Sequence, residues 1–247
     1  MNKYLIDNIP IAIPDSIDEI KSLIGSVIDN NEKKYISFIN PEIFIEQRKN
    51  KELRYYLQKS LYNIVDGIGI IKAINRKTKS KYSARNRFAG TDFLLYLPDN
   101  KNVKIFLYGS KKQNIEKAKD NIEKKYKNIK IVGILDGYSK IENERKIEII
   151  NNAKPNILIV CLGCPKQEKW IQQNIDKLNI NLVFGNGGAI DFWSGSVKRA
   201  PKIIIKIGFE WLFRLITNFS IRRLKRQSKI IRYYFEYVFR RITIIKM

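Results

Sequence analysis

The fold class of this chain is decided by residues 156–170, which read Asn-Ile-Leu-Ile-Val-Cys-Leu-Gly-Cys-Pro-Lys-Gln-Glu-Lys-Trp. A short apolar run rich in β-branched residues stops at Gly163, and a segment with helical spacing begins near Pro165. This order is typical of a buried parallel strand followed by the helix that crosses over to the next strand. The stretch therefore predicts one βα unit.

Five other short apolar runs along the chain have the same form. Each ends in Asn, Asp or Gly, and helical spacing follows it. The runs are Tyr35–Ile39 before Asn40, Leu61–Val65 before Asp66, Val103–Tyr108 before Gly109, Ile129–Leu135 before Asp136, and Asn181–Phe184 before Gly185. The repetition predicts an α/β fold with a doubly wound, mostly parallel, Rossmann-like sheet.

The length of 247 residues suits one such domain with a short addition. We expect an α/β domain over residues 1–200 and a basic helical C-terminal appendage over residues 201–247. Within the domain, Arg76–Arg87 is polar and basic, so we expect a long mobile loop there.

Basic residues dominate the composition, with 47 Lys and Arg against 24 Asp and Glu and a formal net charge of +23. From Lys198 onward, 14 basic and 2 acidic residues give a net charge of +12. Such a charge favours anionic partners, namely phosphates, nucleic acid or acidic lipid headgroups. Apolar and aromatic residues recur between these cations at helical spacing, which is typical of an amphipathic segment on an anionic membrane. Packing on the core is the alternative for Trp211 and Leu212.

The chain has two cysteines, Cys161 and Cys164, and no histidine. A histidine-containing zinc site and an imidazole base are therefore excluded, and a reducing cytosol fits best. The Cys-x-x-Cys spacing suits a redox pair, but we favour small residues selected for a tight turn. Charged residues interrupt the start of the chain, and no run approaches about 20 apolar residues, so we expect neither a signal peptide nor a membrane-spanning helix.

The carboxyl ends of parallel strands border the crevice in which open α/β sheets bind ligands. We therefore expect the residues that end the six runs to face one cleft; they are Asn40, Asp66, Gly109, Asp136, Gly163 and Gly185. Turns also require Gly, Asn and Asp, so a purely structural role is the alternative for each of them.

Two of these turns precede helices, where free N–H groups and the helix dipole favour phosphate. They are Gly109-Ser110 and Gly163-Cys164-Pro165, in which Pro165 suits the first helical position. Neither is a P-loop or the spaced glycine fingerprint of dinucleotide enzymes. The second is the more specific, and we favour a functional role for its Gln167, whereas capping and surface charge remain alternatives for Lys166 and Glu168.

Asp66 ends an apolar run, where partial burial strengthens a carboxylate as a base. In a chain without histidine a carboxylate is the natural general base; the alternative is that Asp66 caps the next helix. Tyr138 could stack on a nucleobase, and Asp191, behind the glycine turn 185–188, could accept hydrogen bonds from a base or a sugar. No Asp-x-Asp pair occurs, so we expect basic side chains and helix ends, without a metal, to stabilise a leaving diphosphate.

Together these motifs resemble those of the WecG/TagA/CpsF family of glycosyltransferases, whose members transfer N-acetylmannosamine, its uronic acid, glucose or related sugars to polyprenyl-diphosphate-linked saccharides. The most specific blocks are Pro165-Lys166-Gln167-Glu168 and Arg199-Ala200-Pro201. The other matching motifs, which run through most of the chain, are Asn40-Pro41, Asp66-Gly67-Ile68-Gly69, Arg87 with Gly90-Thr91-Asp92, Gly133, Asp136-Gly137-Tyr138, Gly187-Gly188 with Asp191-Phe192, Gly195 with Lys198, and Glu210-Trp211-Leu212 with Arg214-Leu215.

The resemblance implies an inverting transferase that needs neither a metal nor a cofactor. Asp66 would deprotonate the acceptor hydroxyl, and Arg87 and Gln167 would act with it. A UDP-sugar donor would be bound by Asn40, Gly109, Tyr138, Gly163, Gln167, Gly187 and Asp191. The polyprenyl diphosphate and the anionic membrane would meet Arg214, Arg222, Arg223 and Arg226. Some family members have a threonine where this chain has Phe38, so no hydroxyl role is assigned to Ser37.

The implied setting is the synthesis of cell-surface polysaccharide or teichoic acid, by a cytoplasmic protein peripheral to the inner face of the plasma membrane. A second copy of the chain remains an alternative partner. A basic nucleic-acid-binding protein is the main rival interpretation, since cations between aromatics also suit single strands; no recognised RNA or DNA motif supports it. A nicotinamide dehydrogenase is a third, weakened by the missing glycine fingerprint. The motifs do not specify the sugar, the nucleotide or the acceptor saccharide.

Overall fold

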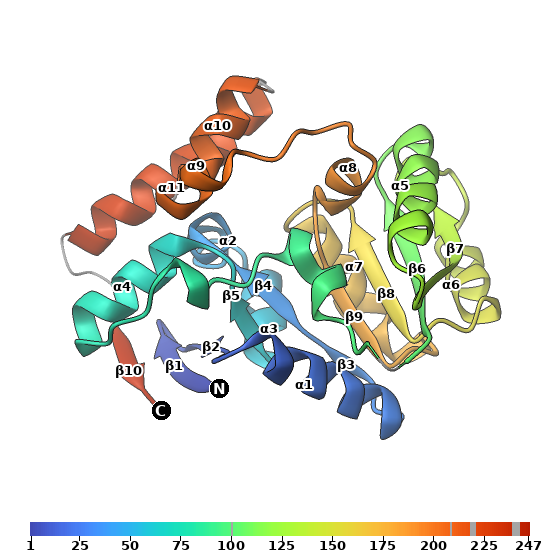
Figure 1. Cartoon of the computed structure of the whole chain (residues 1–247), viewed down its shortest axis with the longest axis horizontal. Helices are drawn as coiled ribbons and strands as arrows, with labels where there is room; N and C mark the ends of the chain where they lie inside the picture. Colours follow the sequence, from blue (N-terminus) through green and yellow to red (C-terminus); the bar gives the residue numbers. More distant parts are fainter. Residues whose placement is uncertain (100, 208, 218–220, 239–242) are drawn as a thin grey trace. The chain divides into compact units, whose positions relative to one another are not determined.

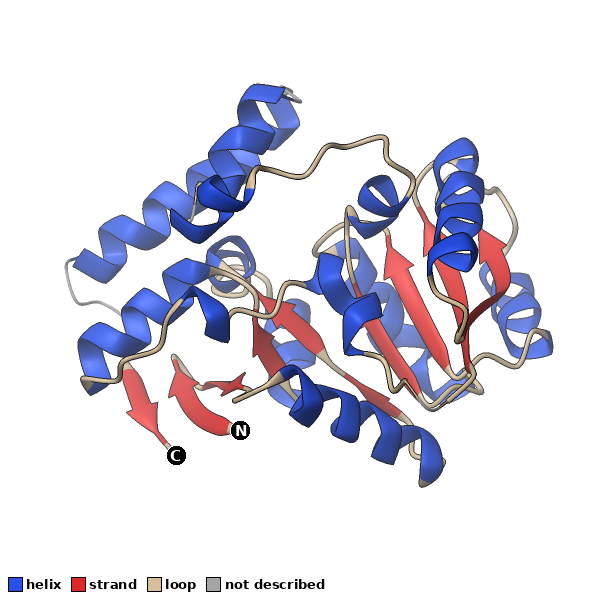
Figure 2. Ribbon diagram, viewed as in Figure 1, coloured by secondary structure: helices blue, strands red, loops and turns tan. Residues whose placement is uncertain are grey.

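The computed structural model describes residues 1–99, 101–207, 209–217, 221–238 and 243–247. Within the helices it leaves the side chains of residues 202, 206, 207, 214, 222, 223, 225, 226, 237 and 238 undescribed. The chain forms two compact units, each built around its own sheet (Figures 1 and 2). Unit 1 comprises Met1–Ser16, Ser37–Ala89 and Arg199–Met247; unit 2 comprises Ile17–Ile36 and Gly90–Lys198.

Unit 2 contains a sheet of five parallel strands in the order β3-β9-β8-β6-β7. Their bounds are β3 Lys34–Tyr35, β6 Val103–Gly109, β7 Ile129–Leu135, β8 Ile157–Cys161 and β9 Leu182–Gly185. The helices of this unit are α1 Ile17–Asp29, α5 Lys112–Lys125, α6 Asn143–Asn152, α7 Lys166–Asn174 and α8 Ala189–Trp193, with short 3-10 turns η2 Gly90–Tyr96 and η3 Ile175–Lys177. The predicted α/β fold with a parallel, Rossmann-like sheet is confirmed.

The strand order of this sheet indicates where a ligand would be expected. The chain moves outward from β6 to β7 and then returns past β6 to β8, so right-handed crossovers place α5 on one face and α6 and α7 on the other. The order of the strands therefore reverses between β6 and β8. In open α/β sheets this is where ligands bind, beyond the carboxyl ends of the strands.

Unit 1 contains a mixed sheet in the order β10-β1-β2-β5-β4. Its strands are β1 Asn2–Ile6, β2 Ile9–Ile13, β4 Ser37–Ile39, β5 Asn63–Val65 and β10 Ile244–Lys246. Strands β2, β5 and β4 pair in parallel, whereas β1 pairs antiparallel with both β2 and β10. The helices are α2 Pro41–Glu46, α3 Lys51–Lys59, α4 Ile68–Thr78, η1 Ala84–Asn86, α9 Lys202–Ile207, α10 Glu210–Thr217 and α11 Ile221–Val238.

The β1–β2 hairpin and β10 are additions to the predicted strands. The hairpin turns at Asp7 and Asn8, which have φ angles of 48° and 64°. Two such residues in succession match the twist of a tight hairpin, and Asp and Asn tolerate this conformation best after glycine. In the sequence this Asp-Asn pair lies between two apolar runs, and that pattern could have predicted the hairpin.

Two sequence-based expectations need correction. The predicted strand Tyr35–Ile39 is divided, because β3 pairs with β9 in unit 2 and β4 pairs with β5 in unit 1. The predicted loop Arg76–Arg87 begins only at Lys79, the left-handed C-cap of α4. Its backbone is held in place, since Asn75 accepts from the Tyr82 N–H and donates to the Tyr82 carbonyl.

The C-terminal segment is integrated into unit 1. Helix α11 packs against α2, and Tyr233 is fully buried, edge-on to Phe44 with ring centroids 5.7 Å apart. The Tyr233 hydroxyl donates to the Gly69 carbonyl at 3.3 Å. After α11 the chain returns as β10, which lies beside β1 in Figure 1. Among the described residues, no helix is long and apolar enough to cross a bilayer.

Replacing Tyr233 with alanine is expected to lower the free energy of unfolding by about 3–5 kcal/mol, because it removes a buried aromatic ring. Urea denaturation followed by circular dichroism measures the change. Phe235→Ala, on the same helix but with 57% of the residue exposed, is the control and is expected to change it by less than about 1 kcal/mol. Equal effects of the two substitutions would contradict the packing described for α11.

Candidate active site

In unit 1, Asp66 directly follows β5 and is fixed by its backbone. Its N–H donates to the Ile39 carbonyl at 2.9 Å, which continues the pairing of β5 with β4. Helix α4 has Gly67 as its N-cap and no side-chain cap bond. The N-cap position that the alternative assigned to Asp66 is therefore occupied by Gly67.

That carboxylate lies against the guanidinium of Arg87. Arg87 Nε and Nη2 each lie 3.3 Å from Asp66 Oδ1, and Nε also donates to the Asp66 carbonyl. The backbone next to Arg87 is held against the end of β5, because the Phe88 N–H donates to the Val65 carbonyl at 2.8 Å. Two residues 21 positions apart are thus brought together at the end of β5.

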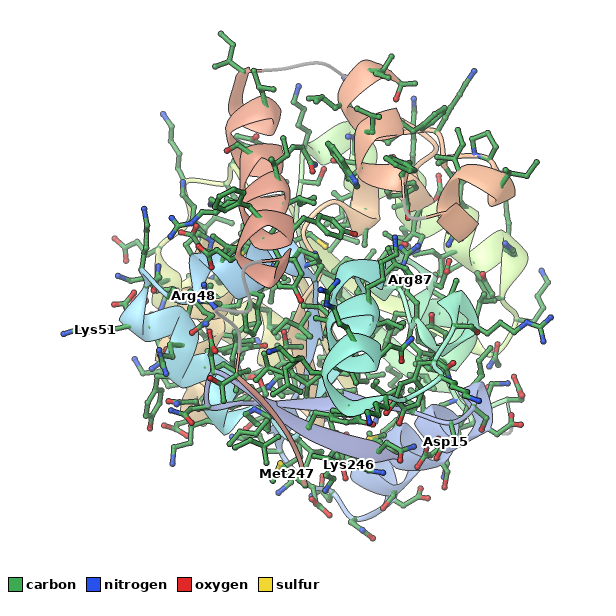
Figure 3. All side chains as sticks on the ribbon, turned by 90° about the vertical axis from the view of Figure 1, so that its left-hand side faces the viewer. Asp15, Arg48, Lys51, Arg87, Lys246 and Met247 are labelled. Atoms are coloured by element: carbon green, nitrogen blue, oxygen red, sulfur yellow. The ribbon has the colours of Figure 1, made fainter. Side chains whose placement is uncertain are left out.

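A third charged side chain contacts Arg87. Arg87 Nη2 donates to Glu210 Oε2 at 2.7 Å, from the first residue of α10. The side chains are largely buried, with 13% of Arg87, 23% of Asp66 and 9% of Glu210 exposed. Burial by itself lowers the pKa of the Arg87 guanidinium, but the charges of Asp66 and Glu210 outweigh it and raise that pKa above its usual value. Figure 3 labels Arg87 beside α4, below the C-terminal helices.

Asn40 lies close to this cluster as the N-cap of α2. Its Oδ1 accepts from the Ile43 N–H at 3.0 Å. Gly67 packs against it so closely that a Cβ at Gly67 would lie 2.4 Å from Pro41 Cδ and 3.0 Å from Asn40 Cα. The Asn40-Pro41 and Asp66-Gly67 motifs are thereby explained as one contact, and unit 1 brings Asn40, Asp66 and Arg87 together.

In unit 2, the glycine turns lie together at the carboxyl ends of β6, β8 and β9. Gly109 pairs in register with Cys161 and has a φ of 130°; a Cβ there would lie 2.5 Å from the Cys161 carbonyl. Gly187 also approaches Gly163 closely, because a Cβ at Gly187 would lie 2.9 Å from Gly163 Cα. Backbone therefore packs directly against backbone at these strand ends. Helices α5 and α7 begin beside these strand ends. Helix α7 starts at Lys166 with Pro165 as its N-cap, one position later than expected.

The buried side chain of Gln167 holds the Gly163 turn in place. Its side chain is 3% exposed; Oε1 accepts from the Gly163 N–H at 3.1 Å, and Nε2 donates to Glu168 Oε1 at 2.7 Å. A Cβ at Gly185 would lie 2.5 Å from Gln167 Nε2. The described contacts of Gln167 therefore shape the Gly163 turn and its packing on β9, and a direct role toward a ligand stays a prediction.

Asp191 and Tyr138 lie at the same end of unit 2 in contrasting settings. Asp191 Oδ1 accepts from the Ser110 hydroxyl at 2.7 Å and from Asn114 Nδ2 at 2.9 Å, which ties α8 to the start of α5. Tyr138 is 72% exposed, and its N–H donates to Asp136 Oδ1 at 3.0 Å. Its ring is thus available for stacking. Whether the residues of unit 1 and unit 2 face one cleft, as expected, stays a prediction.

Cys161 has a structural role at the end of β8. Cys161 is buried, and burial raises the pKa of its thiol to about 12. Its Sγ donates to the Asn186 carbonyl at 3.0 Å. A thiol with so high a pKa is a poor thiolate source at neutral pH, which argues against the redox-pair interpretation.

The predicted cations of the C-terminal segment lie outside the side chains that the structure describes; they are Arg214, Arg222, Arg223 and Arg226. Sequence reasoning missed one group, the buried Glu210, which appeared only as part of the Glu210-Trp211-Leu212 motif. Its partner is 123 positions away in the chain, so no local pattern could have revealed the contact.

The α/β fold and the buried carboxylate–guanidinium cluster are compatible with a group-transfer protein, and comparison with known sequences specifies the class. The glycosyl transferase WecG/TagA/CpsF family model matches residues 6–244. The chain belongs to this family and is a glycosyltransferase.

Three relatives carry the same enzyme name, N-acetylglucosaminyldiphosphoundecaprenol N-acetyl-beta-D-mannosaminyltransferase. The chain is 35% identical to that of Bacillus subtilis (strain 168) over 221 residues, 88% of this chain and 85% of the relative. It is 31% identical to that of Bacillus spizizenii over 217 residues, 85% and 83% of the two chains. It is 29% identical to that of Staphylococcus aureus (strain NCTC 8325 / PS 47) over 213 residues, 85% and 82%.

Gln167→Glu is expected to destabilise the protein by about 2–4 kcal/mol at pH 8, because it buries a second carboxylate against Glu168. Burial and the neighbouring charge raise the folded-state pKa of the new carboxyl above its unfolded value of about 4.3. The loss is therefore absent below that value and grows as the pH rises. Urea denaturation at pH 5 and pH 8 measures it, with Gln173→Glu at an exposed position of the same helix as the control. A loss that is independent of pH would contradict this view.

Proposed function

We propose that this protein transfers N-acetylmannosamine, or a related hexose, from a UDP-sugar to a polyprenyl-diphosphate-linked saccharide. The reaction inverts the anomeric centre and uses no metal or cofactor. The product belongs to cell-surface polysaccharide or teichoic acid synthesis, at the inner face of the plasma membrane. The relatives' printed name, a mannosaminyl transfer to N-acetylglucosaminyldiphosphoundecaprenol, supports the choice of donor sugar and acceptor.

The observation that carries this proposal is the carboxylate of Asp66. It ends β5 without capping α4, and Arg87 fixes its orientation. Because the chain has no histidine, we assign the role of general base to this oriented carboxylate. In the proposed step Asp66 takes the proton of the acceptor hydroxyl, whose oxygen attacks the anomeric carbon from the side opposite the UDP. The bond from that carbon to the diphosphate oxygen breaks, and UDP leaves.

The crevice between β6 and β8 is the proposed site for the donor diphosphate. Helices α5 and α7 begin beside the glycine turns there, so the helix dipoles favour an anion. The residues assigned to the donor are Asn40, Gly109, Tyr138, Gly163, Gln167, Gly187 and Asp191. Tyr138 stacks on the base, while Gln167 acts by holding the Gly163 turn.

Departure of UDP requires its developing negative charge to be stabilised. Helix N-termini and basic side chains can supply this without a cation. Among the residues that the structure describes, no group of three or more carboxylates and thiols is close enough to hold a metal ion. The β linkage in the relatives' name agrees with inversion of an α-linked donor.

The acceptor and the membrane are assigned to the C-terminal segment. Several apolar residues of α10 and α11 are exposed, namely Ile216, Ile221, Leu224, Ile231 and Phe235. Apolar residues between cations favour insertion at an anionic interface, each cation contributing about 1 kcal/mol. We assign Arg214 to the lipid diphosphate, and Arg222, Arg223 and Arg226 to the membrane surface. We therefore assign catalysis to residues 1–200 and membrane association to the appendage of residues 201–247.

Asp66→Asn, which keeps the shape and removes the base, is expected to lower turnover by about 100-fold or more. UDP binding, measured by calorimetry, should be unchanged. The assay follows UDP release from UDP-N-acetylmannosamine with a short-chain polyprenyl-diphospho-N-acetylglucosamine, with and without EDTA, and wild-type activity should survive the chelator.

Asp99→Asn serves as the control, because this carboxylate is exposed and pairs only with a surface lysine, Lys21, in the contacts described. Wild-type turnover in Asp66→Asn would remove Asp66 from the mechanism. Activity lost in EDTA and restored by magnesium or manganese would show a metal requirement.

Neutralising Arg222, Arg223, Lys225 and Arg226 together is expected to weaken binding to phosphatidylglycerol vesicles, with the largest loss at low salt, where screening is weakest. Sedimentation with vesicles at several salt concentrations measures this. Neutralising four exposed lysines of α5, Lys112, Lys117, Lys124 and Lys125, is the matched control for net charge. Equal losses in the two variants, or stronger binding to a single-stranded oligonucleotide than to vesicles, would contradict the membrane assignment.

A further inference from the structure

Glu210 is a buried carboxylate that the proposed reaction does not yet use. Its side chain is 9% exposed, and it is the first residue of α10. A glutamate at the start of a helix is favoured by the helix dipole, but that effect does not require burial. Burial is expensive for a carboxylate unless it is paired. One partner here is Arg87, whose Nη2 lies 2.7 Å from Glu210 Oε2.

The nitrogen that Glu210 contacts is the one that also contacts Asp66. Arg87 Nη2 lies 2.7 Å from Glu210 Oε2 and 3.3 Å from Asp66 Oδ1. One guanidinium therefore contacts two carboxylates, and these three groups together carry a formal charge of −1. The Asp66–Arg87 pair alone would be neutral.

This difference determines the strength of Asp66 as a base. An arginine next to an aspartate stabilises the carboxylate form and weakens it as a proton acceptor, whereas a second nearby carboxylate does the opposite. A base that must accept a proton from a hydroxyl works best when its proton affinity is not strongly reduced. Glu210 offsets Arg87 in this respect, while Arg87 still fixes the orientation of Asp66.

We propose that Glu210 is a positioning residue, whose carboxylate shares Arg87 with Asp66 and so preserves the basicity of Asp66. This inference rests on the proposed function only for its kinetic consequence. The charged groups that it invokes come from three segments: Asp66 after β5, Arg87 after η1 and Glu210 at the start of α10.

The direct test measures the protonation of Asp66 without an activity assay. In protein labelled with ¹³C at the aspartate carboxyls, the Asp66 resonance is assigned by its loss in Asp66→Asn and titrated with pH. Glu210→Gln is expected to reduce the proton affinity of Asp66 by about tenfold, because the positive charge of Arg87 is no longer shared. An unchanged or increased proton affinity overturns the proposal.

Two further variants of Glu210 keep the test decisive. Glu210→Met fills the same buried space without a charge, and it replaces Glu210→Gln if that variant does not fold. Glu210→Asp keeps the charge and is expected to restore most of the proton affinity. A loss in Glu210→Asp as large as in the neutral variants means that the side-chain length and not its charge matters, which also overturns the proposal.

Glu236→Gln is the matched control. Glu236 is likewise a buried glutamate of the C-terminal segment, 5% exposed, and it pairs with Arg48 and Arg232 instead of Arg87. Figure 3 labels Arg48. This substitution is expected to lower stability but to leave the Asp66 titration unchanged. A shift equal to that of Glu210→Gln would indicate a general effect of loosening the segment and would overturn the proposal.

The kinetic consequence separates this inference from the proposed function. In Glu210→Gln the acidic limb of the kcat profile should move to lower pH and kcat on the plateau should fall several-fold, because the base is weaker, while KM for the donor is unchanged. If Asp66→Asn is fully active, the proposed function fails, whatever the titration shows. If Asp66→Asn is inactive and Glu210→Gln has the wild-type titration and pH profile, only the role of Glu210 fails.

Discussion

The burial of the Arg87 guanidinium is the constraint around which unit 1 is organised. A buried cation is stable only if carboxylates or carbonyls surround it. Here the partners come from the end of β5 and the start of α10, positions 66 and 210 of the chain. The same pairing that stabilises the cation holds the proposed base in one orientation and attaches the C-terminal segment to it. Stability and site geometry therefore have a common cause.

The C-terminal segment consequently has two kinds of surface. One side is anchored in unit 1 through Tyr233, Glu236 and the β10–β1 pairing, and these buried contacts weigh against a core that folds without residues 201–247. The other side carries exposed apolar side chains. A segment anchored on one side and apolar on the other is suited to hold an enzyme on a membrane without crossing it. This arrangement favours point substitutions over truncation as a means of studying it.

Local sequence patterns identified the parallel units well, because a buried parallel strand needs a continuous apolar run and its turn needs glycine or a small polar residue. Ile129–Leu135 agrees with β7 at both ends. The same patterns missed the β1–β2 hairpin, whose Asp7-Asn8 turn is a weaker signal than Asn-Gly. They also joined β3 and β4, since Ile36 between them is as apolar as its neighbours and nothing local marks the passage from one sheet to the other.

The candidate site was predictable only in part, and for a different reason. Asp66 could be selected because it ends an apolar run, and Gln167 because three long polar side chains follow a turn. What these side chains contact is decided by tertiary structure. Gln167 turned inward to hold the Gly163 turn, and Asp66 acquired Arg87 and, through it, Glu210. A base is defined by its charged surroundings as much as by its own carboxyl group, so its strength is a property of the folded chain and cannot be deduced from the residue alone.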